Sequence, residues 1–184
     1  IWVATHRPEW TDIVVTFLEK RLKKGTQSEE DIASLKNLML TFAGNSTLQD
    51  YIARQLQQEK NTDTKLLFLS VIKEAQISKL PQSWINEIGN LIQSKDAKLQ
   101  TVALGLIESR RIAELEKNLD QLIQQPSQPA SVRLQGLSAK LVAKPQLNDG
   151  DFNLISSFLR KGNDPPIRQS AARLFVQAQL NEEQ

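Results

Sequence analysis

Four basic residues that could bind an acidic partner or a phosphate backbone recur along the chain at nearly constant steps. They are Lys65, Lys98, Arg133 and Arg168, so the steps between them are 33, 35 and 35 residues. A fixed period in the thirties indicates stacked repeats, each built from one pair of helices. Because the four side chains lie one repeat apart, we expect them to form a column. This column either binds an anion as a basic stripe or connects neighbouring repeats.

The overall charge favours the structural interpretation, in which the four side chains connect neighbouring repeats. The chain has 184 residues, with 23 Lys plus Arg against 21 Asp plus Glu and a formal net charge of +2. Proteins that bind nucleic acid normally carry a clear basic excess. We therefore expect neither nucleic acid nor an anionic surface as the partner, and we expect the column to be structural.

Residue types that usually carry out chemistry are sparse. His6 is the only histidine, and no matched acid lies near it in the sequence, so packing or capping is the simpler interpretation. The chain has no cysteine, which excludes disulfides, thiolate nucleophiles and covalent haem attachment within it. The glycines never form a phosphate-binding spacing. We expect no catalytic residue, metal site or cofactor in this segment.

The three tryptophans are the remaining candidates. Trp10 and Trp84 lie in helical frames with aliphatic residues, which predicts core positions. The alternative is an exposed anchor for a partner, because Trp is enriched in binding hot spots. Trp2 is the least constrained of the three and is a candidate anchor against an upstream domain, as Trp84 is for another partner.

Apolar residues recur at steps of three and four almost throughout, and strand-like alternation is nearly absent, which predicts an all-α fold. Gly, Pro, Ser and Asp residues punctuate the pattern, with Ser28 and Ser46 as expected N-caps. Helices are expected at 9–23, 28–42, 46–56, 63–75, 81–94, 96–109, 113–124, 129–142, 149–161 and 165–178.

A second periodic feature supports the helix pair. An apolar i, i+3, i+4 frame begins at Val14, Ile52, Ile88, Leu119 and Ile155, with steps of 38, 36, 31 and 36 residues. Both helices of the pair therefore repeat at a similar period. This predicts about five pairs in a single domain spanning 1–184, with residues 1–60 diverged and residues 61–184 more regular.

The last pairs resemble HEAT repeats. The stretch from Asp164 to Phe175 has a proline lead-in, an aliphatic-Arg pair at Ile167-Arg168, and two small residues before a large apolar one. The stretch from Ala130 to Leu137 is similar. The resemblance implies a right-handed α-α superhelix of the HEAT or armadillo type. It also implies that the arginine bonds to backbone or to an acid in the adjacent repeat.

A narrower resemblance concerns residues 2–10 and 168–184. These look like the HEAT-like segment of large bacterial multidomain proteins of the PVC group, labelled membrane-bound dehydrogenases or haem-binding proteins. That resemblance implies a longer, exported or periplasmic redox protein whose propeller and cytochrome domains flank an excised segment. Its haem site lies outside this cysteine-free chain. No apolar run approaches the roughly 18 residues that a membrane span needs.

The expected function is a non-catalytic scaffold or protein-interaction segment that contacts flanking domains or another protein. An alternative is a nucleic-acid-binding or DNA glycosylase-like HEAT protein. In that alternative Lys65, Lys98, Arg133 and Arg168 supply charge on a concave face and Trp84 supplies an aromatic surface.

Overall fold

The computed structural model describes residues 9–23 and 28–180. Over these residues the chain forms ten α-helices and one short 3-10 helix, with no strand beyond an isolated bridge between Gln146 and Gln179. The all-α prediction is confirmed for this part of the chain. The chain forms two compact units, residues 1–88 and 89–184.

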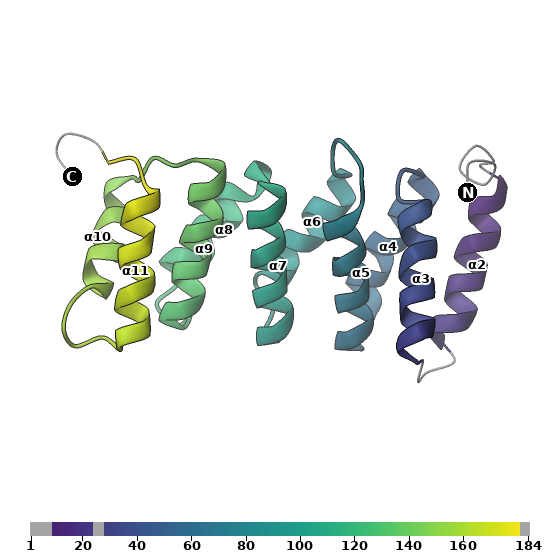
Figure 1. Ribbon diagram of the computed structural model, residues 1–184, viewed down its shortest axis with the longest axis horizontal. Coiled ribbons are helices and arrows are strands. Elements are labelled where there is room, and N and C mark those ends of the chain that lie inside the picture. The colour runs from purple at the N-terminus through teal and green to yellow at the C-terminus, as the bar shows by residue number, and fades with distance from the viewer. Residues whose placement is uncertain (1–8, 24–27, 181–184) are drawn as a thin grey trace. The chain divides into compact units, whose positions relative to one another are not determined.

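The first unit contains four helices and the start of a fifth. Their bounds are α2 (Glu9–Lys23), α3 (Glu29–Thr41), α4 (Ser46–Gln58), α5 (Thr62–Glu74) and α6 (Gln82–Leu91), which ends in the second unit. Helix α3 packs beside α5, while α2 packs against α4 and α4 against α5 (Figure 1). The helices of the first unit therefore form two layers with an apolar core between them.

Aromatic residues occupy the centre of this first core. Tyr51 and Phe68 meet edge to face, with ring centroids 6.1 Å apart. Trp84 is fully buried, and its indole Nε1 donates to the carbonyl oxygen of Gln49 over 2.8 Å. Since a buried indole N–H needs an acceptor, this bond makes the core position favourable for Trp84. Trp84 is thus a core residue and cannot be an exposed anchor.

The second unit repeats the two-layer arrangement. Its complete helices are α7 (Ala97–Arg110), η1 (Ala113–Leu115), α8 (Glu116–Gln124), α9 (Ala130–Ala143), α10 (Asp149–Phe158) and α11 (Pro165–Gln177). Helices α7, α9 and α11 lie side by side, with α9 in the middle, and α8 and α10 form the layer behind them (Figure 1). Helix α9 contacts every other α-helix from α7 to α11.

Side-chain caps account for five of the ten α-helix starts in the described residues. Ser28 accepts from the Asp31 amide, as the sequence predicts. The expected cap at Ser46 is wrong by one residue, because Asn45 accepts from the Thr47 amide instead. Asn is as good an N-cap as Ser, and the extended backbone at Asn45 places its side chain over the free amides. Further caps come from Asn61, Asp96 and Asn148.

Helix α2 buries only part of the face expected. The sequence predicts one apolar face made of Trp10, Ile13, Val14, Phe17, Leu18 and Leu22. Leu18 of this face is buried, as are Thr11 and Val15 beside it, whereas Trp10, Ile13 and Phe17 are 42%, 67% and 47% exposed. Two adjacent stripes of α2 are rich in apolar residues, and only the one through Leu18 is covered. The core prediction is therefore wrong for Trp10.

Helices α8 and α9 lie close together at Gly136. A Cβ atom placed there would lie 3.1 Å from Ile123 Cγ1 and 3.3 Å from Leu122 Cδ2, whereas Gly105 in α7 has nothing within 4 Å. Both glycines are helix-interior positions, where Ala is intrinsically favoured by roughly 0.5–1 kcal/mol. We expect Gly105→Ala to raise the free energy of unfolding by about that amount. Gly136→Ala should lower it by about 1 kcal/mol, because the added methyl overpacks the contact.

Urea denaturation of the two variants, followed by circular dichroism, measures both changes, and each variant serves as the control for the other. Equal stabilisation by the two substitutions would show that α8 and α9 separate readily at Gly136. That result would contradict a tightly packed interface between the layers.

Candidate interaction site

The four basic residues of the periodic column occupy the first turns of four helices. Lys65 lies in α5 of the first unit, and Lys98, Arg133 and Arg168 lie in α7, α9 and α11 of the second. Lys98 is exposed, while the other three are half-buried. Their environments differ, so the column does not act as one uniform surface.

Arg133 is tied to the layer behind α9. Its Nε donates to the carbonyl oxygen of Ile123 in the last turn of α8 over 2.6 Å. Its guanidinium carbon also lies 5.5 Å from the centroid of the Phe158 ring in α10. Burial lowers the pKa of Arg133 from its ordinary value. These contacts link three helices, as the structural interpretation of the column expects, and they use the Nε–H of the guanidinium.

The same bond is made in the preceding pair by a residue outside the column. Gln100 donates through Nε2 to the carbonyl oxygen of Ile92, over 2.8 Å. Ile92 and Ile123 hold the same position in the repeated i, i+3, i+4 frame, at the carboxyl ends of α6 and α8. Carbonyls at helix ends have no intrahelical donor, and long polar side chains can supply one. Gln100 therefore does for α6 what Arg133 does for α8.

Arg168 holds the matching position in α11, yet its bonding differs. Its Nε is buried and has no hydrogen-bond partner among the described residues. Leu159, which corresponds to Ile123 in the frame, directly follows α10. The backbone contact that the resemblance implies is therefore present for Arg133 and not for Arg168.

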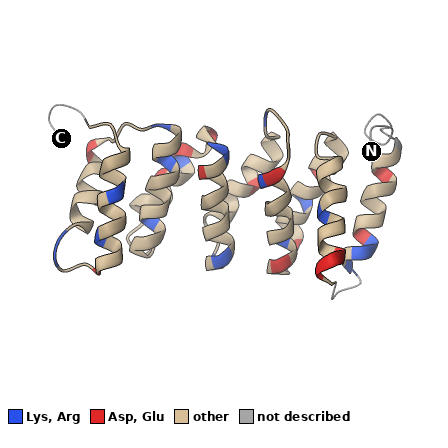
Figure 2. Cartoon of the chain, in the orientation of Figure 1, with Lys and Arg blue, Asp and Glu red and all other residues tan. Residues whose placement is uncertain are grey.

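Charged residues are mixed in both units. Figure 2 shows basic and acidic residues on the same helices, which agrees with the near-neutral net charge. Trp84 and Arg133, two of the five residues assigned to a glycosylase-like face, are engaged inside the protein. Trp84 cannot stack on a base without leaving the core, and the Nε–H of Arg133 is already used within the protein.

A buried ionic cluster is the main feature that sequence reasoning missed. The Nζ of Lys140 in α9 lies 2.6 Å from Asp120 Oδ1 in α8 and 2.6 Å from Asp151 Oδ2 in α10. The side chains of Lys140 and Asp151 are 6% and 1% exposed. The only signal in the sequence is a lysine among core residues of α9, between Ala139 and Leu141.

The electrostatics of this cluster favour a charged lysine. Burial lowers the pKa of Lys140, but the hydrogen bonds and charges of Asp120 and Asp151 outweigh burial, so its pKa lies above the ordinary 10.5. A catalytic lysine normally needs a depressed pKa that frees its amine. Lys140 therefore links α8, α9 and α10 through its two carboxylate partners.

Two surface hollows are candidates for binding. One lies in the second unit on the face formed by α7, α9 and α11, with a volume of about 320 Å³. It combines hydroxyl, amide and charged side chains with an apolar floor. Because three helices contribute its walls, it is the better candidate for a built site.

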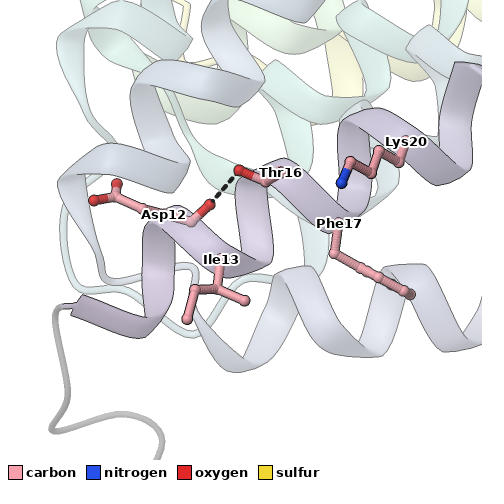
Figure 3. A pocket seen from close by; sticks show the side chains of 5 residues that line it. All are labelled: Asp12, Ile13, Thr16, Phe17 and Lys20. Atoms are coloured by element: carbon pink, nitrogen blue, oxygen red, sulfur yellow. Dashed lines mark hydrogen bonds between the residues drawn. The ribbon is translucent and has the colours of Figure 1, made fainter.

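The other hollow follows helix α2 alone. Its lining residues are Asp12, Ile13, Thr16, Phe17 and Lys20. Ile13 and Phe17 extend to one side of the helix, and the Thr16 hydroxyl donates to the Asp12 carbonyl over 2.8 Å (Figure 3). One helix cannot enclose a ligand, so this space of about 380 Å³ is an open, largely apolar surface.

Two searches of the described residues gave negative findings. In the ranges 9–23 and 28–180, no group of three or more His, Cys, Asp or Glu side chains could hold a metal ion. Within the same ranges, no helix has the length and apolar character to cross a membrane. Trp2 and His6 lie outside the described residues.

Comparisons with protein-family models, with curated proteins and with solved structures give no match for this chain. The HEAT-repeat resemblance and the resemblance to a redox parent therefore stay predictions from the sequence.

The ionic cluster yields a stability prediction with a matched control. We expect Lys140→Met to lower the free energy of unfolding by about 3–5 kcal/mol, because it leaves the Asp151 carboxylate buried without a cation. Lys144→Met removes the solvent-exposed pair with Glu116 from the same helix end. Such exposed pairs contribute less than about 1 kcal/mol, so this variant should change little.

The contribution of Lys140 to the free energy of unfolding depends on pH with a definite sign. Because the folded-state pKa of Lys140 is raised, its stabilisation is complete below the ordinary 10.5 and declines as the pH rises through the folded value. Guanidinium denaturation at neutral and strongly alkaline pH should therefore show the wild-type advantage over Lys140→Met shrinking at alkaline pH. A small and pH-independent difference would show that the cluster contributes little.

Proposed function

We propose that this chain is a non-catalytic scaffold and protein-interaction segment, built as a right-handed HEAT-like solenoid of about five helix pairs. The observation that carries the proposal is the repeated packing scheme. In each unit, helices of one layer pack on their neighbours and on the layer behind them. The carbonyl bonds of Gln100 and Arg133 recur at equivalent frame positions in successive pairs. A stack of helix pairs presents a long surface for partners.

Exposed apolar side chains support a role in protein contacts. Trp10, Ile13 and Phe17 lie close together on α2, and Val176 of α11 is 88% exposed. Large exposed apolar groups that cluster are typical of interaction surfaces. If the parent resemblance holds, the segment spaces or docks the flanking domains of an exported redox protein, whose electron-transfer chemistry resides in those domains.

The repeat architecture predicts an unusual response to truncation. In a solenoid each pair contacts only its neighbours, so deleting residues 148–184 should remove the helical signal of α10 and α11 and leave the rest folded. Deleting residues 165–184 removes α11 alone. Helix α10 packs mainly against α11, so it should then unfold as well and give nearly the same loss of ellipticity.

Circular dichroism and thermal unfolding of the two truncated chains measure these outcomes. The shorter chain should keep a cooperative transition at a lower temperature, since Lys140 loses Asp151 and Arg133 loses the Phe158 ring. Collapse of the entire helical signal in both truncations would indicate one indivisible core and would contradict the repeat proposal.

The interaction role is tested by photochemical cross-linking in the cells that produce the protein. A benzophenone amino acid in place of Ile13 or Val176 should give discrete cross-links, either to another protein or to another part of the same polypeptide. Lys73, an exposed residue of α5, provides the control position and should give few. The absence of discrete cross-links at both apolar positions would count against the scaffold role.

A further inference from the structure

The groove on the α7, α9 and α11 face has walls of hydrogen-bonding side chains above an apolar floor. Leu134 of α9 and Leu174 of α11 are both buried and form the floor. On α9 and α11, polar residues lie next to these leucines or about one turn from them, and α7 adds one more. Those used below are Glu108 from α7, Ser138 and Gln135 from α9, and Ser170, Arg173 and Gln177 from α11.

Some of these polar groups are already engaged. The Ser138 hydroxyl donates to Glu108 Oε1 over 3.0 Å, and Gln135 Nε2 donates to the carbonyl oxygen of Thr101 over 3.2 Å. These bonds fix the α7 side of the groove. Glu108 keeps its second carboxylate oxygen, and Gln135 keeps its amide oxygen, as acceptors.

The α11 side is unengaged. The side chains of Ser170, Arg173 and Gln177 form no hydrogen bond or ion pair with a described residue, and all three are exposed. Hydroxyl and amide groups both donate and accept, so they suit a ligand that alternates donors and acceptors. Arg173 offers a planar fork of N–H donors that matches a carboxylate.

We propose that this groove binds an extended peptide segment of a partner protein, with an Asp or Glu side chain of the peptide paired to Arg173. The inference rests on the proposed interaction function and names its surface and partner chemistry. An extended peptide presents alternating N–H and C=O groups, and each needs a partner when it is covered. The hydroxyl and amide walls supply those partners, while the leucine floor accepts an apolar side chain.

Charge orients the peptide and disfavours nucleic acid. Glu108 and Arg173 come from helices on opposite sides of α9 (Figure 1). A partner carboxylate is attracted to the α11 side and repelled from the α7 side, where Glu108 instead accepts peptide N–H groups. A phosphate backbone carries a negative charge on every nucleotide, so Glu108 opposes it.

The test uses the whole chain and a display library of short unstructured peptides. Selection should enrich peptides that carry Asp or Glu, and fluorescence anisotropy then gives their affinities. We expect Arg173→Gln to weaken binding by about tenfold or more, since a hydrogen bond to a charged group is lost. The affinity of Arg173→Lys should lie between those of wild type and Arg173→Gln, because lysine keeps the charge and lacks the forked N–H donors. Arg160→Gln, an equal charge change at an exposed residue outside the groove, should have no effect.

The groove assignment is overturned if no peptide is selected, if the selected peptides lack acidic residues, or if they bind Arg173→Gln as tightly as wild type. Binding of a single-stranded oligonucleotide that depends on Arg173 would also overturn it. The cross-links at Ile13 and Val176 are independent of Arg173. Discrete cross-links with a failed peptide test would leave the interaction function standing and remove only this groove.

Discussion

Helix ends inside packed layers need hydrogen-bond partners, and the arrangement of each unit follows from how they are supplied. At the amino ends, short polar side chains accept from free amides within the same helix. At the carboxyl ends of α6 and α8, the donor comes from the next helix in the chain, through Gln100 and Arg133. An amino-terminal cap is local, whereas a carboxyl-terminal donor joins two elements. The second kind therefore holds the end of one helix against the next helix in the chain.

The buried Lys140 of α9 fixes how the neighbouring helices align, which apolar packing alone does not. Leucine and isoleucine side chains tolerate small shifts of one helix along another, because burial depends on area and not on angle. The Lys140 ammonium instead has to meet Asp120 and Asp151 together, 2.6 Å from each. A shift of one residue in α10 would leave the buried Asp151 carboxylate without its cation, and a shift in α8 would remove one of the two carboxylates that Lys140 meets. Helix α9 is thus held in a single register by its polar contacts and stabilised there by its apolar ones.

The sequence predicts the helices well because their signals are local. Periodicity and capping residues depend on neighbours a few positions away, and the observed ends differ from the predicted ones by only a few residues. Burial is harder to predict where a helix is apolar on two adjacent stripes. Trp10 and Leu18 belong to different stripes of α2, and only packing against α4 decides which one is covered.

The polar contacts could not be predicted in the same way. The partners of Lys140 lie 11 and 20 positions away, on two different helices, and nothing in the local sequence links them. The Ile92 carbonyl likewise receives its donor from Gln100, although the period pointed to Lys98. A carbonyl at the end of a helix needs a donor, and several residue types at neighbouring positions can supply it.

The same reasoning separates side chains that hold the fold together from side chains that bind a partner. Arg133, a member of the periodic column, contacts the helices packed around it. A residue that recognises one partner has no reason to recur, and its donors must remain available after the helices have packed. Arg173 meets this condition, since it is exposed and unpaired among the described residues, only five positions after the last member of the column. The search for function in such a fold therefore belongs with the polar side chains that packing leaves unused.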